Sequence, residues 1–371
     1  MGACVKALRP MSLSSFATLL KRLTTDCDGE QLASLLAISA SHPALAWLPA
    51  GSAREPAPLA EALSRGPSGA ALFPSDASWP RIAACVVCAS SALAASPPDA
   101  LLALGFAREA LEELHEPVVE VEDGWVVAPL LRVARDAVAL LPAARARASA
   151  EDRVEVFQAR RDDLMNMMRR RFGDCSRGSG KRSACVAIAN IMCRLYFQLH
   201  TPRQARFFMD NVDAAKVDLG AFPAGVAVTF RYYAGRLFMY EDRLADANRM
   251  LGLAFEQCHK GPAAAAARLR ILEALLPVRL LLGRLPSRAL LDAYGLAPRY
   301  GGIVRGLALG DLAAYRAALE EGMEYFVRRG TYLLLDRLQL LVVRSLVKRL
   351  CVCGAAASPA APPLGPFSYT P

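Results

Sequence analysis

The residue types best suited to chemistry are ten cysteines and four histidines. Cys85 and Cys88 lie three residues apart in an apolar, helical stretch, so both thiols share one face and resemble half of a zinc site. A structural zinc ion needs four ligands, and no second pair of Cys or His lies nearby. Cys258 and His259 are adjacent, so they point to different sides of a helix and cannot form a nucleophile–base pair. We therefore expect free thiols, no metal site and no catalytic residue.

One glycine-rich segment, Gly178 to Lys181, has the composition of a phosphate-binding loop. It lacks the upstream glycine that such a loop needs, and it follows a predicted helix instead of a strand. The metalloprotease and serine-hydrolase motifs, HExxH and GxSxG, do not occur in the sequence. We interpret the segment as a flexible loop between helices, and we expect neither enzyme activity nor a cofactor.

The chain is basic, with 44 Lys and Arg against 35 Asp and Glu and a net charge of +9. Only six of the basic residues are lysine, which indicates that part of the arginine excess reflects coding bias. The charge still favours an acidic partner, either a protein or a nucleic acid. A basic cluster formed by Arg169 to Arg171 with Arg177, Lys181 and Arg182 fits an acidic peptide or a weak nuclear signal. A solvated face is the alternative both for this cluster and for the C-terminal basic residues named next. The candidate phosphate-contacting residues lie together near the C-terminus and are Arg328, Arg329, Arg337, Arg344, Lys348 and Arg349.

With 371 residues, the chain is long enough for two or three domains with a sizeable core. Its longest weakly charged stretch, Ile82 to Ala107, is cut by Pro97 and Pro98, so neither piece could span a bilayer. The first residues, Met1 to Arg9, lack the long apolar core of a signal peptide. We expect a soluble, intracellular protein with no membrane partner.

Apolar residues recur with the helical period of 3.6 in nearly every segment, as at Ile188, Met192 and Leu195. Strand-like alternation is nearly absent, so the predicted fold class is all-α. Proline and glycine divide the sequence into helical hairpins, and one stretch rich in Pro, Gly, Ser and Ala is typical of a flexible linker. The predicted organisation is N-terminal helices over 1–48, a flexible linker over 49–80, an N-terminal helical region over 81–150, helical repeats over 151–330 and a disordered Ala/Pro tail over 351–371.

Two hairpins share one frame of small and large residues, the pattern of tetratricopeptide-like repeats. Gly235 and Phe238 lie on the first helix of one hairpin, and Ala247, Leu251 and Ala254 lie on its second helix. Small residues allow paired helices to approach closely, and large residues fill the groove between pairs. We predict a helical-repeat, TPR-like solenoid with Gly235 and Ala247 at a helix–helix contact. The equivalent positions one repeat earlier are Cys193, Tyr196, Ala205, Met209 and Val212.

The segment from Phe230 to His259, which contains Tyr232-Tyr233-Ala234-Gly235-Arg236, resembles the PCI-domain subunit of the TREX-2 mRNA-export complex, the Thp-type family. COP9 signalosome subunit-12-like proteins are related to this family. The resemblance is strong over about 175–350 and weaker over 90–174. Further similarity lies at Ala274 to Gly283, Gly310-Asp311-Leu312, Tyr325 to Gly330 and Leu333 to Leu350. The residues to which we assign structural roles in the repeats are Gly235, Phe238, Ala247, Ala254, Pro277, Gly283, Gly310 and Asp311.

The resemblance implies a PCI helical-repeat protein with a winged helix appended to the last repeats. Such subunits pack against a scaffold protein of the GANP/Sac type, bind a small acidic Sem/DSS-type protein along their repeats, and contact RNA or DNA through their winged helices. The complex couples transcription to mRNA export at nuclear pores. We therefore expect this protein to be located in the nucleus, at or near nuclear pores, and a second, cytoplasmic location is the alternative. The alternative is a scaffold subunit of another PCI assembly, either COP9 signalosome-like or the proteasome lid.

The chain departs from the family near its C-terminus. The segment 331–350 matches the first helix of the winged helix, but the family pattern ends at Cys351. We therefore expect an incomplete C-terminal winged helix and weak, non-specific nucleic-acid binding, with a Kd of about 10⁻⁴–10⁻⁶ M. An apolar side formed by Leu334, Leu338 and Leu341 would then be exposed.

Overall fold

The structure, a computed structural model, describes residues 11–48, 55–65, 70–74, 77–121, 123–177, 182–214 and 217–357. These residues are helical for most of their length. The described ranges contain no β-strand, and a single antiparallel bridge joins Arg65 to Ala71. The predicted all-α fold class is confirmed.

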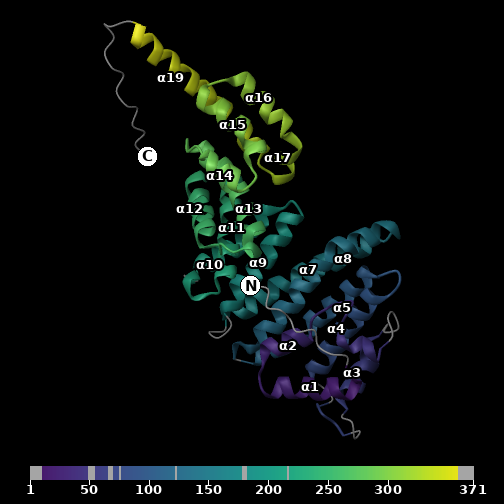
Figure 1. Cartoon of the computed structure of the whole chain (residues 1–371). Helices are drawn as coiled ribbons and strands as arrows, with labels where there is room; N and C mark the ends of the chain where they lie inside the picture. The colour runs from purple at the N-terminus through teal and green to yellow at the C-terminus, as the bar shows by residue number, and fades with distance from the viewer. Residues whose placement is uncertain are drawn as a thin grey trace. The chain divides into compact units, whose positions relative to one another are not determined.

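The helices form two compact units, Met1–Val226 and Ala227–Pro371, so the expected repeat region 151–330 is divided between them (Figure 1). The first unit contains α1 (Leu13–Thr25), α2 (Gly29–Leu35), α3 (Pro56–Ser64), α4 (Ser78–Ala94), α5 (Ala100–Glu113), α6 (His115–Glu120), α7 (Val127–Ala150), α8 (Val154–Arg177), α9 (Arg182–Gln198) and α10 (Arg206–Ala214). The second contains nearly all of α11 (Ala224–Tyr240), then α12 (Leu244–Gln257), α13 (Ala265–Leu281), α14 (Arg288–Ala293), α15 (Ala297–Leu309), α16 (Leu312–Glu321), α17 (Met323–Arg329), α18 (Tyr332–Asp336) and α19 (Gln339–Ala357).

Helix α4 packs against α3 and α5 in the first unit. Its residues from Ile82 to Ala92 are buried on every side, as expected for a helix that is apolar all round. Helix α5 begins at Asp99, whose carboxylate accepts a hydrogen bond from the backbone N–H of Leu102 at 2.8 Å and so caps the helix. The α5 residues in turn pack on α7.

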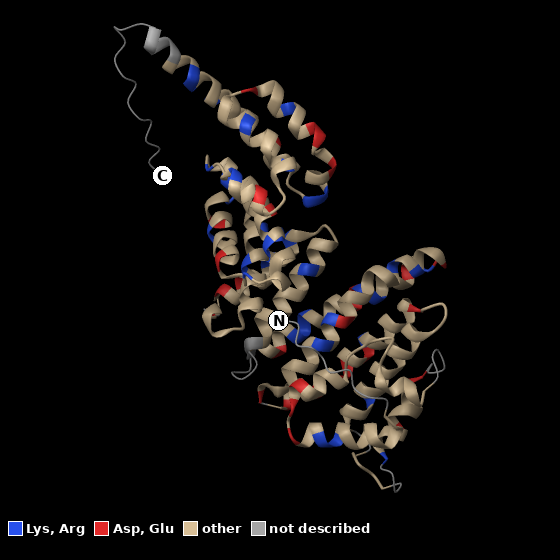
Figure 2. Ribbon diagram, viewed as in Figure 1, with Lys and Arg blue, Asp and Glu red and all other residues tan. Residues whose placement is uncertain are grey.

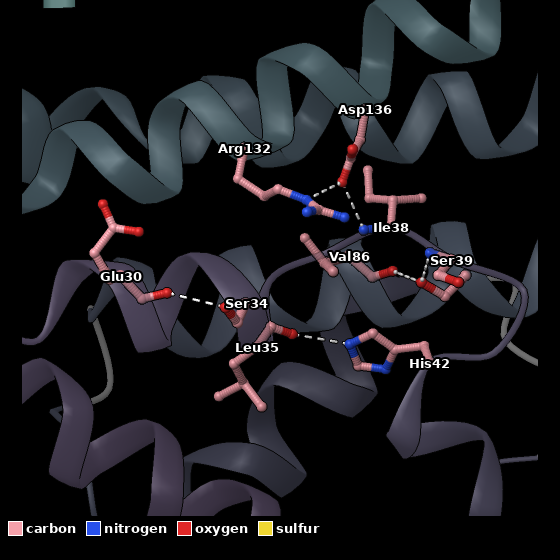
Figure 3. Close-up of polar contacts among 10 residues, drawn as sticks. Glu30, Ser34, Leu35, Ile38, Ser39, His42, Val86, Arg132 and Asp136 are labelled. Atoms are coloured by element: carbon pink, nitrogen blue, oxygen red, sulfur yellow. Dashed lines mark hydrogen bonds and ion pairs between the residues drawn. The ribbon is translucent and has the colours of Figure 1, made fainter. Parts of the chain in front are cut away.

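A partly buried polar network ties the N-terminal segment to α4 and α7 (Figure 3). The Asp136 carboxylate accepts hydrogen bonds from the Ile38 backbone N–H at 3.0 Å and from Arg132 Nε at 2.8 Å. The His42 ring accepts the Ala44 N–H at Nδ1, so its Nε2 carries the proton and donates to the Leu35 carbonyl at 2.9 Å. Burial lowers the pKa of His42, which keeps the ring neutral.

The segment 49–80, predicted to be a flexible linker, differs from that expectation in its described residues. Pro56 occupies the first turn of α3, where a missing N–H costs nothing, and Ala60 and Leu63 are buried against α4. Phe73 is also buried. The high proline and alanine content therefore reflects a short packed helix as well as a connection.

The predicted contact between Gly235 and the following helix is present in the second unit. A Cβ at Gly235 would lie 2.6 Å from Leu251 Cγ, so α11 and α12 approach as closely as only glycine permits. Ala247, Leu251 and Ala254 are fully buried, and Phe238 packs against the same cluster. In the first unit, the equivalent residues Cys193, Tyr196, Ala205, Met209 and Val212 are buried too.

The other residues with predicted structural roles lie at helix ends or in the core. Pro277 is buried within α13, and Gly283 follows that helix with a φ of +76°. Gly310 ends α15 in the left-handed conformation, and a Cβ there would lie 2.5 Å from the backbone nitrogen of Leu346. Asp311 caps α16 by accepting the Ala314 N–H at 2.9 Å.

The C-terminal segment differs from its prediction in two ways. The single helix expected over 331–350 is two helices, α18 and α19, separated by Arg337 and Leu338. Helix α19 then continues to Ala357, so the first part of the expected disordered tail is helical. Residues 358–371 lie outside the described residues.

Candidate interaction surface

The cysteines singled out by spacing lie in the core. Cys85 and Cys88 are buried in α4, and burial raises the pKa of Cys85 and raises that of Cys88 to about 12. Such thiols stay protonated and unreactive at neutral pH. Cys258 is buried, whereas the His259 ring accepts the Gly261 N–H at 2.9 Å, so the two residues do not act together. The glycine-rich segment Gly178 to Lys181 lies outside the described residues.

A cavity of about 820 Å³ lies between α3, α4 and α5, and Cys85 lines it. Its charged groups largely neutralise one another, because Arg81 pairs with Glu113 at 3.0 Å and Arg108 pairs with Glu112 at 3.1 Å. Within the described ranges, no cluster of three or more His, Cys, Asp or Glu could hold a metal ion. No described helix is long and apolar enough to cross a membrane.

Four of the six predicted phosphate-contacting residues form contacts within the second unit. Arg328 pairs with Glu324 one turn earlier in α17, at 2.5 Å. Arg329 pairs at 3.1 Å with Glu273 of α13, and its guanidinium also lies over the Tyr325 ring. Both arginines therefore serve contacts within the second unit.

Arg337 and Arg349 also have partners. Arg337 donates two hydrogen bonds to the Asp242 carboxylate, at 2.6 and 3.2 Å, which joins the α18–α19 junction to the turn between α11 and α12. These hydrogen bonds lower the pKa of Asp242 and raise that of Arg337. Arg349 donates to the Leu309 carbonyl at 2.9 Å, at the C-terminal end of α15.

Arg344 and Lys348 are the remaining two, and both are exposed on α19. Neither forms an ion pair within the part of the chain that the structure describes. They lie four residues apart, so their charges project from the same side of the helix. Figure 2 shows basic but no acidic residues along α19. Among the six predicted contacts, Arg344 and Lys348 are thus the two that form neither an ion pair nor a side-chain hydrogen bond among the described residues.

In the basic cluster from Arg169 to Arg182, the side chains of Arg169 and Arg171 form contacts within the first unit. Arg171 is buried in α8, where it pairs with Asp174 at 3.1 Å and contacts the His115 ring. Arg169 donates two hydrogen bonds to the Tyr196 hydroxyl, at 3.1 and 2.7 Å. Arg170 is exposed. Nothing is described for the side chains of Arg177, Lys181 and Arg182.

One buried group, Glu273, was missed by the sequence analysis. Its side chain is almost fully buried in α13, where it accepts a hydrogen bond from the Tyr325 hydroxyl and pairs with Arg329. Burial and this hydrogen bond raise the pKa of Tyr325 to about 12. A lone carboxylate inside the apolar run Ile271 to Leu276 was the available signal, because such a charge needs a partner.

The apolar side of the last helices is not the one predicted. Leu334 and Leu338 are buried and Leu341 is partly buried, all within the core clusters of the second unit. The exposed apolar residues of α19 are instead Leu340, Val343, Leu346, Val347, Leu350 and Val352. The exposure is therefore not confined to one face of the helix.

The paired helices, with most of the singled-out residues packed between them, define a helical-repeat protein. No family model matches the chain. A PCI domain-containing protein of Schizosaccharomyces pombe is 33% identical over 174 residues, which are 46% of this chain and 39% of that protein. Enhanced ethylene response protein 5 of Arabidopsis thaliana is 34% identical over 186 residues, which are 49% of this chain and 44% of that protein. A CSN12 homolog of Neurospora crassa is 32% identical over 172 residues, which are 45% of this chain and 38% of that protein.

Over somewhat less than half of its length, the chain is therefore similar to PCI domain-containing proteins and to a CSN12 homolog, which supports the coarser prediction of a PCI-domain protein. The chain spans less than half the length of the curated relatives it matches. The relatives carry names from both the PCI domain-containing and the CSN12 groups, so the finer assignment to one assembly is a proposal.

Proposed function

We propose that the chain is a non-catalytic scaffold subunit of a TREX-2-type complex, which couples transcription to nuclear mRNA export at or near nuclear pores. The observation that carries the proposal is the close α11–α12 contact at Gly235, within the segment that resembles the Thp-type family. The similarity to PCI domain-containing proteins supports it as well.

In this role the chain would bind other proteins and would catalyse no reaction. Its repeats would pack against a GANP/Sac-type scaffold protein and a small acidic Sem/DSS-type protein. Nucleic acid would bind weakly, because only Arg344 and Lys348 of the six predicted contacts are unpaired within the described ranges.

A second function, a scaffold subunit of a COP9 signalosome-like particle, is favoured by the similarity to a CSN12 homolog. Affinity purification of the tagged chain from nuclear extract, followed by mass spectrometry, separates the two. We expect a Sac-type scaffold protein and a small acidic protein in near-stoichiometric amounts. Recovery of signalosome or proteasome-lid subunits in their place would support the alternative and contradict the proposal.

A further inference from the structure

A second cavity, of about 620 Å³, lies in the first unit among α7, α8 and α9, three helices that pack against one another (Figure 1). It shares no lining residue with the cavity between α3, α4 and α5. Its volume is within the range of about 300–1,000 Å³ that is typical of small-molecule sites. The cavity is therefore large enough to hold a ligand.

Each of the three helices lines this cavity with one face. The lining residues of α7 lie between Leu141 and Ser149, and those of α8 lie between Val154 and Arg161. In both helices they recur every three or four residues, so they share one side of the helix. Helix α9 contributes its last turn and the residue at which the chain leaves the helix, His200, which has a φ of +58°.

The inner part of the lining is apolar. Leu141, Phe157 and Leu195 line the cavity, and their exposed fractions are only 6%, 6% and 1%. Val154 and Leu199 line it as well and are more exposed, so the apolar lining continues to the surface. Such a lining favours a ligand with an aliphatic or aromatic body, because binding removes that body from water.

The charged groups of the lining favour an anion. Arg145 and His200 line the cavity, and neither side chain forms an ion pair or a hydrogen bond among the described residues. Arg161 is the other cation of the lining, and it pairs at 2.8 Å with its sequence neighbour Asp162. None of the described residues that line the cavity is acidic. A bound anion would therefore meet two free hydrogen-bond donors without displacing an existing partner.

We propose that this cavity binds a single-chain aliphatic carboxylate. The chain would lie on the apolar lining, and the carboxylate would accept hydrogen bonds from Arg145 and His200. The lining face of α7 is about 12 Å long from Leu141 to Ser149, which accommodates a chain of about ten carbon atoms. The inference does not rest on the scaffold role, because it concerns a small molecule and the first unit alone.

Other ligands fit the cavity less well. A cationic amphiphile would meet Arg145 and Arg161 without any acidic residue in the lining to offset them. Nucleobases commonly stack on the faces of aromatic side chains, but Phe157, the one Phe, Tyr or Trp in the lining, is almost fully buried. A carboxylate on an aliphatic chain uses both the apolar and the basic part of the lining.

The test measures binding of decanoate and of decylammonium to the full 371-residue chain by isothermal titration calorimetry, below the critical micelle concentration of each probe. The two probes share a ten-carbon chain and differ in the sign of their charge. We expect one decanoate to bind per chain, at least about tenfold more tightly than decylammonium at low salt. The difference should shrink as salt is raised, because the charges are screened.

Two variants and two matched controls locate the site. Val154→Trp places a large side chain in the cavity and should weaken decanoate binding at least about tenfold. Its control, Val156→Trp, makes the same change at an exposed residue of α8 outside the lining. Arg145→Glu should weaken decanoate binding and strengthen decylammonium binding, a gain that loss of folding could not produce. Its control is Arg170→Glu, at an exposed position of α8, and both controls should bind as the unaltered chain does.

Three results would overturn the inference. One is the absence of saturable decanoate binding, and another is equal affinity for the two probes. The last is decanoate binding that persists in both Val154→Trp and Arg145→Glu, because the ligand would then lie elsewhere on the chain. The proposed function fails separately, through the composition of the purified complex.

Discussion

Gly235 has no Cβ, and a Cβ at this position would lie only 2.6 Å from Leu251 Cγ. The Gly235→Ala variant should destabilise the second unit by about 1–3 kcal/mol, because overpacking outweighs the gain in helix propensity. Gly301→Ala is the matched control, since nothing lies within 4 Å of a Cβ at this position in α15. The control should instead stabilise the chain by about 0.5–1 kcal/mol. Urea unfolding followed by circular dichroism at 222 nm gives both values, and a neutral or stabilising effect at Gly235 would show that the helices are not in close contact.

His42 gives the first unit a defined dependence on pH. Its pKa is lowered on folding, so the unfolded chain binds the proton more tightly, and the stability present above pH 6.5 is lost as the pH falls. The loss at pH 5 should not exceed about 2 kcal/mol, the limit set by the unfolded-state pKa. Trp47, Trp79 and Trp125, the three tryptophans of the chain, all lie in this unit and report its unfolding by fluorescence.

The control for this pH effect is His42→Gln, which keeps a side-chain N–H donor for the Leu35 carbonyl but does not titrate between pH 5 and 8. Stability measured at pH 7.5 and pH 5 should fall more in the unaltered chain than in the variant. Equal losses in both proteins would mean that the ring is not held neutral by burial.

At the scale of the elements, the sequence predicted what depends on local periodicity. The 3.6-residue spacing of apolar positions identified the helices, and the small-residue frame identified the α11–α12 contact. Helix α3 was missed because Pro56 and its alanine-rich surroundings are also typical of a linker. The break at Arg337 and Leu338 was missed because the apolar period continues through it.

The contacts of the basic residues were harder to predict, because they join positions that are distant in the sequence. Arg337 and Asp242 are 95 residues apart in sequence, and nothing in either local pattern pairs them. The same holds for Arg349 and the carbonyl of Leu309. Sequence reasoning found the basic residues, but not which of them would be used within the fold.

The ion pair between Arg337 and Asp242 should contribute little to stability, because both side chains are at least half exposed. A double-mutant cycle with Arg337→Ala and Asp242→Asn should give a coupling of about 0.2–1 kcal/mol at low salt, which decreases in 1 M NaCl. Asparagine is the suitable replacement because Asp242 has a φ of +61°. A coupling well above 2 kcal/mol would mean that the pair is more protected from solvent than the structure shows.

At the scale of the whole molecule, the net charge of +9 suggests stronger binding of nucleic acid than we expect from the chain. If Arg344 and Lys348 make the phosphate contacts, the slope of log K against log[salt] for single-stranded RNA should be near −1.4, which is about −0.7 for each contact. Arg344→Ala/Lys348→Ala should bring it close to zero, whereas Lys260→Ala/Arg270→Ala should leave it unchanged. A steep slope that survives loss of both α19 cations would place the RNA surface elsewhere.

The proposed scaffold role is tested most directly by reconstitution from purified components. The full chain is mixed with a Sac-type scaffold protein and a small acidic Sem/DSS-type protein, and the mixture is separated by size-exclusion chromatography with light scattering. We predict a ternary complex with one copy of each protein, which does not form when the chain carries a bulky substitution at Gly235 that disrupts the repeats. Separate elution of all three proteins, together with incorporation of the chain into a reconstituted COP9 signalosome-like particle, would contradict the proposal.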